Sequence, residues 1–437
     1  MAETQAPSDL PRVESSVLRR AVLAGLIGHF VEWYDYGVYA YVAATLAVVF
    51  FPSDNPTASL LAVFATFAVA FFARPVGGLF FGSLGDRIGR QRTLATVVIL
   101  ISLATFVIGV LPGYASIGVL APALLVGARV LQGFSAGGEI AGATSFINEY
   151  APDNRRALLS SFLPAGSATG LLFGATLVTL LNSTLSESAV TSWGWRVPFL
   201  IALPLGGIGL YLRLKIEDTP MFRALANAAE VSPTPLRSSI TQGFRWIAVA
   251  FGATLSYGVG FYVVPSYMPT FLAEELNYDV LSTYAVTAAV LLAHIILLPL
   301  WGALSDRIGR KPVIMGGSIA LVILTYPAFL VVAEGQVLAY AIVAGATLGG
   351  LIAACAAPLF AFMAELFPTR VRYSSISIGY NLSVMTFGGT APFIATFLIS
   401  QTGSNIAPSF YLIAAAIGTV LAVAPTSERI GQALRQT

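Results

Sequence analysis

The sequence predicts an all-α integral membrane protein with twelve transmembrane helices in two pseudo-symmetric six-helix bundles. The 437 residues are 57% hydrophobic and only 10% charged, with a mean hydropathy of +0.81. A water-soluble fold of this size could not carry that composition on its surface. Apolar stretches of roughly 20 or more residues recur along the chain, which is the length of a membrane-spanning helix. In addition, a glycine-rich basic turn occurs twice, half a chain apart.

The two basic turns indicate a duplicated membrane domain. The first reads GSLGDRIGRQR around Asp86, and the second reads GALSDRIGRK around Asp306, 220 residues later. Glu149 and Glu365, each followed by a proline three residues on, lie 216 residues apart. Two independent marks at nearly one period predict an internal repeat. A phosphate-binding loop is not expected, because no strand precedes the turns and the Walker lysine pattern is missing.

Apolar runs between charge clusters and Pro or Gly breaks predict six helices in each half. The first six are expected at residues 21–51, 57–84, 93–112, 117–150, 156–181 and 195–214. The second six are expected at residues 243–273, 280–304, 312–333, 336–367, 373–401 and 406–424. The chain therefore divides into an N-terminal segment (1–20), a first bundle (21–214), a linker (215–242), a second bundle (243–424) and a tail (425–437).

The linker is the longest polar interval, and we expect a short helix within it. Asp218 and Thr219 offer an N-cap oxygen before Pro220, a residue that suits the first turn of a helix. Met221 and Phe222 begin an apolar stripe, so this helix is expected to lie on the inner membrane surface. No soluble domain fits here or in the tail.

The distribution of Lys and Arg predicts the orientation in the membrane. If the N-terminus is cytoplasmic, 20 of the 23 basic residues fall in cytoplasmic segments. Because cytoplasmic loops carry the excess of positive charge, both termini are expected in the cytoplasm of a multi-pass cell (inner or plasma) membrane protein. The first apolar run is too long for a cleavable signal peptide. The single cysteine, Cys355, cannot form an intrachain disulfide.

Several motifs resemble those of the major facilitator superfamily. The two basic turns are similar to its loop motif, and Arg129-x-x-x-Gly133-x-x-x-Gly137 is similar to its fourth-helix motif. A narrower resemblance is to the metabolite:proton symporter family and, within it, to the proline/betaine osmoprotectant branch. The resemblance to the symporter family is carried by Glu32-Trp33-Tyr34-Asp35, Arg74-Pro75-x-Gly77-Gly78, Gln132-Gly133-x-x-x-Gly137-Gly138-Glu139, Trp193-Gly194-Trp195-Arg196-x-Pro198-Phe199 and Ile216-Glu217-Asp218-Thr219-Pro220. The resemblance to the branch is carried by Phe261-Tyr262, and by Phe367-Pro368 with Arg372-Tyr373-Ser374 and Tyr380-Asn381.

This resemblance implies a proton-coupled symporter that imports a small organic solute by alternating access, with a proline or glycine betaine type zwitterion as the best candidate. An organic acid such as a dicarboxylate, citrate or 2-oxoglutarate is the alternative, and an exporter of the same fold is a further one. A channel or a membrane enzyme is disfavoured. The expected partners are the solute, protons and the lipid bilayer, with no nucleic acid, cofactor or metal, and the monomer is expected to function. The branch's C-terminal coiled-coil extension is missing, so osmosensing through such a tail is not expected.

Ionisable residues within apolar helices are costly and therefore point to function. The spans hold three acids (Glu32, Asp35 and Glu139) and two arginines (Arg74 and Arg129). If each arginine pairs with one acid, the remaining carboxyl lacks a partner, and desolvation favours its protonated form. That group would be a proton carrier.

The resemblance to sugar symporters implies that Asp35 faces Arg129 as a protonation-sensitive pair. Protonation of Asp35 would free Arg129 to bind a substrate carboxylate, and deprotonation would restore the pair. A purely structural pair is the alternative. Glu32 lies one turn away and is a second candidate. Glu139 either takes part in coupling or braces the helices, for example against Arg74.

Further residues are candidates for substrate binding. Arg74 either anchors helix packing or binds substrate, and the histidines are either interhelical donors or proton relays. The seventh helix, broken by Pro265 and Pro269, is rich in aromatic side chains, which attract quaternary ammonium groups but also pack in cores. The full candidate set is Arg129, Arg74, Trp33, Tyr36, Tyr257, Phe261, Tyr262, Tyr380, Asn381 and His294, with His29 as a possible relay.

The basic turns are expected to form gates. Asp86 can cap a helix of the opposite half, while neighbouring arginines pair with acids such as Glu149. These contacts would hold the inner gate shut in one state and break in the other. The expected gating residues are Asp86, Arg87, Arg90 and Glu149, with Arg92 beside them, and their repeat equivalents Asp306, Arg307, Arg310 and Glu365.

Overall fold

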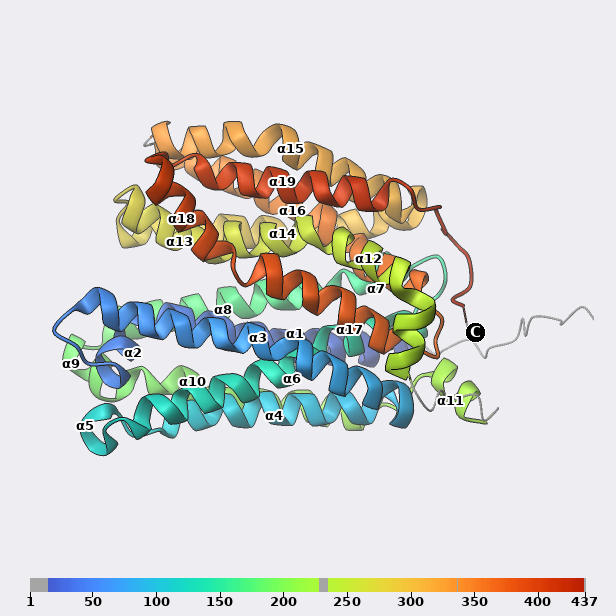
Figure 1. Cartoon of the computed structure of the whole chain (residues 1–437), viewed down its shortest axis with the longest axis horizontal. Helices are drawn as coiled ribbons and strands as arrows, with labels where there is room; N and C mark the ends of the chain where they lie inside the picture. Colours follow the sequence, from blue (N-terminus) through green and yellow to red (C-terminus); the bar gives the residue numbers. More distant parts are fainter. Residues whose placement is uncertain (1–14, 228–234, 336, 436–437) are drawn as a thin grey trace, which may run out of the picture.

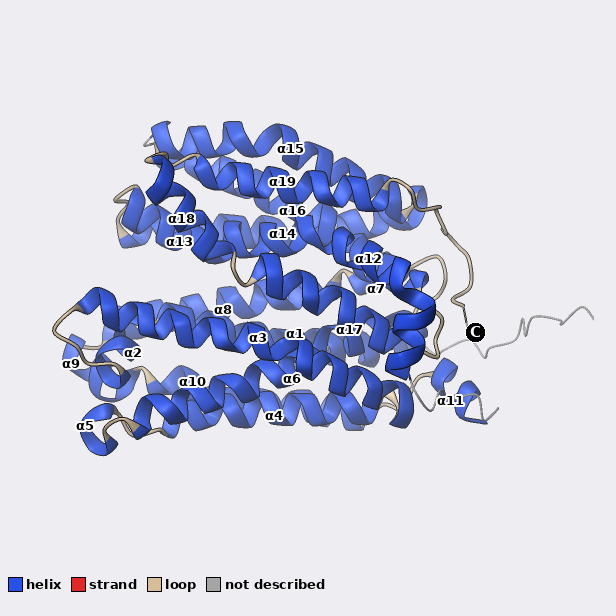
Figure 2. Cartoon of the chain, viewed as in Figure 1, coloured by secondary structure: helices blue, strands red, loops and turns tan. Residues whose placement is uncertain are grey.

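The structure is a computed structural model that describes residues 15–227, 235–335 and 337–435. In these ranges the chain is almost entirely helical and contains no strand (Figure 2). The two halves of the sequence form two layers of roughly parallel helices, the first half below and the second half above in Figure 1. Long apolar runs in the sequence become these helices because a helix satisfies all its backbone hydrogen bonds internally.

The first half runs from α1 to α10. Its elements are α1 (Ser15–Tyr41), α2 (Ala43–Phe50), α3 (Pro56–Ile88), α4 (Arg90–Val110), α5 (Tyr114–Ile117), α6 (Leu120–Tyr150), α7 (Arg156–Ser160), α8 (Phe162–Thr184), α9 (Glu187–Ala189), the π-helix η1 (Val190–Gly194) and α10 (Arg196–Leu214). A short helix, α11 (Pro220–Asn227), follows in the linker.

The second half runs from α12 to α19. Its elements are α12 (Pro235–Phe261), η2 (Tyr262–Tyr267), α13 (Met268–Thr270), η3 (Phe271–Glu275), α14 (Val280–Ile308), α15 (Arg310–Gly335), α16 (Leu338–Leu366), α17 (Arg372–Ser383), η4 (Val384–Gly388), α18 (Ala391–Thr402) and α19 (Ala407–Val423).

The helix pattern agrees with twelve spans. Ten helical stretches in the described ranges are long and apolar enough to cross a membrane, and α19 is a shorter apolar helix. The first span, α1, carries the charged residues discussed below. The predicted break in the seventh span is wrong: Pro265 and Pro269 lie in a helix that continues through π-helical turns from α12 to η3.

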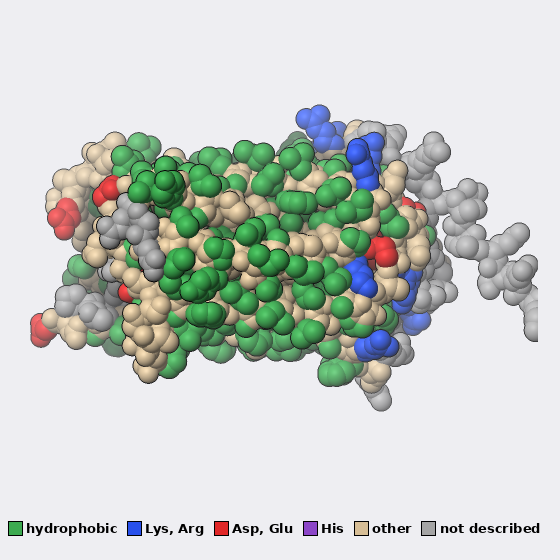
Figure 3. Space-filling view, turned by 90° about the horizontal axis from the view of Figure 1, so that it is seen from above, with side chains coloured by type: hydrophobic (Ala, Val, Ile, Leu, Met, Phe, Trp, Pro, Cys, Tyr) green, Lys and Arg blue, Asp and Glu red, His purple; other side chains and the backbone are tan. Residues whose placement is uncertain are grey.

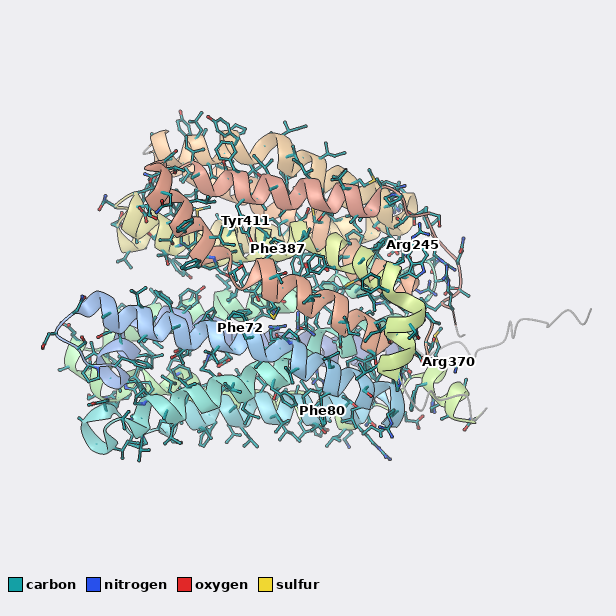
Figure 4. The ribbon with its side chains drawn as sticks, viewed as in Figure 1. Phe72, Phe80, Arg245, Arg370, Phe387 and Tyr411 are labelled. Carbon is teal, nitrogen blue, oxygen red and sulfur yellow. The ribbon has the colours of Figure 1, made fainter. Side chains whose placement is uncertain are left out.

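Small residues allow the helices to approach closely. A Cβ atom on Gly133 of α6 would lie 1.9 Å from the carbonyl oxygen of Ala70 in α3, and one on Gly77 of α3 would lie 1.6 Å from that of Phe134. Lipid-embedded helices associate through such backbone contacts because apolar burial offers little driving force there. The outward face of α3 is apolar instead, with Phe72 and Phe80 more than half exposed (Figure 4).

The two ends of the bundle differ in charge. Lys and Arg side chains gather at the end where the C-terminus lies, and the long apolar surface separates them from Asp and Glu at the other end (Figure 3). We call these the basic end and the opposite end. The turns between α3 and α4 and between α14 and α15 lie at the basic end, as does α11 (Figure 1).

The linker helix begins as the sequence predicts but packs differently. Thr219 caps it, since its hydroxyl oxygen accepts a hydrogen bond from the backbone N–H of Phe222 (3.2 Å). Met221 and Phe222 are buried against the protein, and the Phe222 ring lies 5.0 Å from the guanidinium carbon of Arg90. The apolar stripe therefore covers the basic end of the bundle, and these two side chains do not face lipid.

Candidate functional site

Asp35 and Arg129 form the buried ion pair that the sequence predicts. Their side chains approach to 3.2 Å between α1 and α6. Gln132 joins both, because its amide donates to Asp35 (2.6 Å) while its oxygen accepts from Arg129 (2.9 Å). The guanidinium carbon of Arg129 also lies 4.2 Å from the ring centre of Tyr39. No described contact of Arg129 comes from the second half.

Glu32 pairs with Arg74 one helical turn away from Asp35. The two side chains lie 2.8 Å apart, and His29 approaches Glu32 from the other side at 3.3 Å. Arg74 also donates to the hydroxyl of Tyr36 (3.1 Å) and to the side-chain oxygen of Asn381 in α17 (3.5 Å). Arg74, unlike Arg129, therefore reaches from the first half to the second.

The suggested pairing of Glu139 with Arg74 is wrong. Glu139 forms an ion pair with Arg213 in the last turn of α10, and both side chains are buried. The sequence places Arg213 among the basic residues of the cytoplasmic loops, because it lies at the end of an apolar run. With Arg213 included, the three acids of the spans, Glu32, Asp35 and Glu139, each pair with an arginine. None of these three carboxyl groups therefore lacks a partner in this conformation, contrary to the expectation.

Aromatic side chains from both halves meet beside Arg74. The ring centre of Trp33 lies 4.8 Å from that of Phe261 and 5.4 Å from that of Tyr262. Tyr262 in turn lies 5.4 Å from Phe71 of α3. All four side chains are buried. We call Trp33, Phe71, Phe261 and Tyr262 the aromatic cluster.

The remaining predicted substrate residues surround this cluster. Tyr257 lies 5.5 Å from Phe261, and Tyr380 is buried nearby against Phe360. His294 lies 5.3 Å from Phe261, and its Nδ1 donates to the carbonyl oxygen of Gly349 (3.0 Å). Its contact with α16 matches the interpretation of this histidine as an interhelical donor.

The first basic turn caps a helix of the opposite half, as predicted. Asp86 accepts hydrogen bonds from the backbone N–H groups of Tyr373 (3.3 Å) and Ser374 (2.9 Å) at the start of α17. Glu149 binds Arg90 (3.3 Å) on its own half and Arg372 (2.7 Å) on the other. These contacts join the two halves at the basic end.

The second turn repeats the arrangement. Asp306 accepts from the backbone N–H groups of Ala157 (3.0 Å) and Leu158 (2.8 Å) in α7. Glu365 binds Arg310 (3.1 Å) and Arg156 (3.5 Å). The basic end is therefore closed by two pseudo-symmetric sets of contacts.

Three predicted gating arginines do not take part. Arg87, Arg92 and Arg307 are exposed and form no ion pair among the described residues. The buried positions in the two turns are occupied by Arg90 and Arg310. Conversely, Arg156 and Arg372 were not predicted as gating residues, although they lie 216 residues apart, the same period as Glu149 and Glu365.

The linker and the tail add further caps at the basic end. Asp218 accepts from the backbone N–H of Arg90 (3.1 Å) at the start of α4. Burial raises the pKa of this carboxyl, although its backbone hydrogen bonds and Arg90 oppose that rise. Glu428 does the same for α15, since its carboxylate accepts from the backbone N–H of Lys311 (2.9 Å).

The tail also contacts the gate arginines. Arg156 donates to the carbonyl oxygen of Gln432 (2.7 Å), and Arg372 donates to that of Arg435 (3.0 Å). The residues from Glu428 to Arg435 therefore lie against the closed interface.

No group of three His, Cys, Asp or Glu side chains in the described part of the chain lies close enough to hold a metal ion. The chemistry that the site can offer is thus ion pairing, proton exchange and binding of a cation by aromatic rings.

Comparison with protein families gives two matches. Residues 21–232 match the family described as "Sugar (and other) transporter", and residues 250–429 match the Major Facilitator Superfamily. The two matches correspond to the two halves of the repeat.

Comparison with curated proteins gives relatives of similar length. The chain is 37% identical over 418 residues to the glycine betaine/proline/ectoine/pipecolic acid transporter OusA of Dickeya dadantii, covering 94% of this chain and 83% of the relative. It is 37% identical over 419 residues to the proline/betaine transporter of Escherichia coli, with the same coverage.

Solved structures share the fold. The proton:xylose symporter XylE bound to 6-bromo-6-deoxy-D-glucose superimposes with a TM-score of 0.80 at 19% identity, covering 97% of this chain and 98% of that one. A partially occluded inward-open conformation of the xylose transporter XylE from E. coli gives a TM-score of 0.71 at 19% identity, with 96% and 100% coverage.

Proposed function

Because the chain belongs to the major facilitator superfamily, in its proline/betaine transporter branch, we propose that it imports a small zwitterion of the glycine betaine or proline type together with protons. The observation that carries this proposal is the position of Arg74 beside the aromatic cluster. A zwitterion needs a binding site for each charge, and here both kinds of group come together where the two halves meet.

The aromatic cluster suits the cationic end of such a solute. Rings from both halves meet edge-on or tilted, and an ammonium group held against an aromatic face is attracted by its negative π-surface. Arg74 suits the carboxylate, because a guanidinium forms strong charge-assisted hydrogen bonds with a carboxylate. Its Nη2 atom has no hydrogen-bond partner among the described residues. Arg129, whose contacts all lie within the first half, is then left for coupling.

Coupling would proceed through Asp35. Protonation removes the charge that pairs with Arg129 and weakens the link between α1 and α6, whereas deprotonation restores it. A change in this pair alters the helix that also carries Glu32 and Trp33, so proton binding and solute binding affect each other. Glu32, which pairs directly with Arg74, would transmit the change to the solute.

The charge distribution supports a cytoplasmic location for the basic end, and hence for both termini in a cell membrane. In this orientation the inner gate is closed in the present conformation. Solute would enter from the opposite end and leave after the contacts around Asp86 and Asp306 break.

An organic acid remains the second candidate substrate. Arg129, like Arg74, has an Nη2 atom without a partner in the described ranges, so two guanidinium groups could bind two carboxylates. Uptake of radiolabelled glycine betaine into proteoliposomes, with unlabelled glycine betaine or 2-oxoglutarate as competitor, distinguishes the two. Competition by 2-oxoglutarate alone would contradict the zwitterion proposal.

Asp35→Asn tests the coupling step in the same proteoliposomes. The variant should lose accumulation driven by a pH gradient, because it cannot bind and release the proton, yet keep exchange of internal for external solute. Asp54→Asn, at an exposed carboxylate outside the spans, is the control and should behave like the wild type. Full gradient-driven accumulation by Asp35→Asn would exclude this residue as the coupling group.

A further inference from the structure

The buried pair of Glu139 and Arg213 lies between the coupling pair and the gate. On α6, Glu139 follows Arg129 by ten residues and precedes Glu149 by ten. At 1.5 Å of rise per residue, each interval is about 15 Å along the helix. A proton that leaves Asp35 for the basic end must cross the membrane depth at which Glu139 lies.

This pair has unused hydrogen-bonding capacity, and a small cavity adjoins its arginine. Arg213 binds Glu139 through Nη2 and donates from Nη1 to the carbonyl oxygen of Leu94 (2.6 Å). Oε2 of Glu139 and Nε of Arg213 have no partner among the described residues. A cavity of about 10 Å³ with mainly apolar walls adjoins Arg213 and is lined by Ala24, Gly25, Gln91, Leu94, Phe146 and Arg213.

Polar side chains connect the pair to the coupling site along α1. A Cβ atom on Gly28 would lie 1.8 Å from Nη2 of Arg213 and 2.5 Å from Oε1 of Glu139, so the pair touches the α1 backbone. The next residue is His29, whose Nδ1 lies 3.3 Å from Glu32, and Glu32 is one turn from Asp35. Ionisable groups thus follow each other from Asp35 to Glu139.

The other helices that pack near Glu139 offer few competing groups. From the second half, Tyr373 of α17 interacts electrostatically with Glu139, and its hydroxyl donates to the carbonyl oxygen of Gly138 (2.6 Å). From α3, Phe81 packs at Gly138, and from α4 the Leu94 carbonyl binds Arg213. Arg213 is therefore the charged side chain in contact with this carboxylate.

We propose that Glu139 is a second proton-binding residue and that Arg213 is the positioning residue that controls it. The proton released from Asp35 passes through water to Oε2 of Glu139, where an O–H bond forms and the carboxylate becomes neutral. Arg213 then loses its counter-charge and keeps its hydrogen bond to the carbonyl oxygen of Leu94. When the basic end opens, the O–H bond breaks, the proton passes to bulk water, and the ion pair forms again. This inference deepens the proposed proton coupling and rests on it.

Glu139→Gln and the double variant Glu139→Gln/Arg213→Gln test the proposal in proteoliposomes with radiolabelled glycine betaine. Gradient-driven uptake by Glu139→Gln should fall by about a hundredfold, the lower range for loss of a positioned proton-transfer group. Exchange should persist. The residual uptake should no longer respond to the pH of the compartment that the basic end faces. Glu139→Asp, which keeps a carboxyl group, should retain this pH response.

The double variant separates proton binding from a structural role. Removing both charges leaves no unpaired buried ion, so a purely structural pair would tolerate it. We expect the double variant to fold, to exchange solute and to remain insensitive to pH at the basic end. Wild-type uptake and pH response in the double variant would overturn the proposal. Failure of the proposed function itself would differ, because the wild type would then show no dependence on a proton gradient.

Discussion

At the scale of single residues, the membrane interior of this protein holds three carboxylates and three arginines in matched pairs. A buried ion pair gains little net stability, since desolvation offsets much of the attraction, but loss of one partner costs about 3–5 kcal/mol. Asp35, Glu32 and Glu139 therefore depend on Arg129, Arg74 and Arg213. Protonation of any one acid has the same effect as removing its charge, which makes each pair sensitive to protons.

The ring of Trp33 allows a direct test of zwitterion binding. Trp33→Leu removes one face of the aromatic cluster, and a cation–π contact of about 0.5–2 kcal/mol corresponds to a roughly 2- to 30-fold rise in the KM for glycine betaine. Trp33→Phe keeps a ring and should change KM much less. Kinetics of uptake at a fixed pH gradient measure both, and an unchanged KM in Trp33→Leu would place the solute elsewhere.

The resemblance to sugar symporters implied the Asp35–Arg129 pair, but neither it nor the residue types indicated the partner of Glu139. Asp35 and Arg129 stand out because both interrupt long apolar runs. Arg213 lies at the end of a run, where arginines usually reach the membrane surface, and only the packing of α10 against α4 and α1 turns it inward. The pairing of Arg74 with Glu32 depends on the placement of α1 against α3, which sequence spacing does not specify.

At the scale of elements, close contact between α3 and α6 holds the arginines in place. Arg74 and Arg129 lie on these two helices, and Gly77 and Gly133 let the backbones meet. The glycine motif in α6 predicts a close helix contact, but it does not identify α3 as the partner helix. In the seventh span the sequence pattern was misleading. Its prolines suggested a break, yet the helix continues because π-helical turns accommodate Pro265.

Substitution of Gly133 should separate α3 from α6. A methyl group there would lie 1.9 Å from the Ala70 carbonyl oxygen, a backbone atom that cannot rotate away, so Gly133→Ala should destabilise the protein by about 1–3 kcal/mol. Gly127→Ala, on the same helix, is the matched control, because a methyl group at that position would meet nothing within 4 Å. Melting temperatures in detergent compare the two, and equal values would contradict this packing.

At the scale of the whole molecule, the repeat produces one gate from two equivalent sets of contacts. Asp86 caps α17 across the interface, and Asp306 caps α7 in the reverse direction. The 220-residue period predicted both turns and their role in joining the halves. The period did not predict that the tail binds the gate. Its contacts with Arg156 and Arg372 use backbone carbonyl oxygens, which every residue has and which therefore leave no pattern in the sequence.

Removal of both caps should open the basic end. Each aspartate accepts at least two backbone hydrogen bonds, and loss of buried partners costs about 1–3 kcal/mol each, enough to shift the equilibrium between closed and open states by about tenfold or more. Spin labels at Arg87→Cys and Arg307→Cys, which are exposed on either side of the gate, measure this in a Cys355→Ser background. Asp86→Asn/Asp306→Asn should lengthen the distance between the labels.

Asp279→Asn is the control for this experiment. Asp279 also caps a helix, α14, through the backbone N–H groups of Leu281 and Ser282, but it does so within one half and away from the basic end. Its substitution should leave the distance between the labels unchanged. A similar lengthening in both variants would indicate general loosening of the fold.

The tail connects the gate to a segment outside the membrane that a binding protein can reach. Because Gln432 and Arg435 supply acceptors to Arg156 and Arg372, those arginines bind the closed interface and the tail at once. An antibody fragment that binds residues 428–435 and displaces them would remove one hydrogen-bond acceptor from each guanidinium group. It would thereby favour the conformation that releases solute to the cytoplasm. A fragment that holds the same segment against the gate would keep the basic end closed. This short segment is therefore a suitable target for trapping the closed or the open conformation.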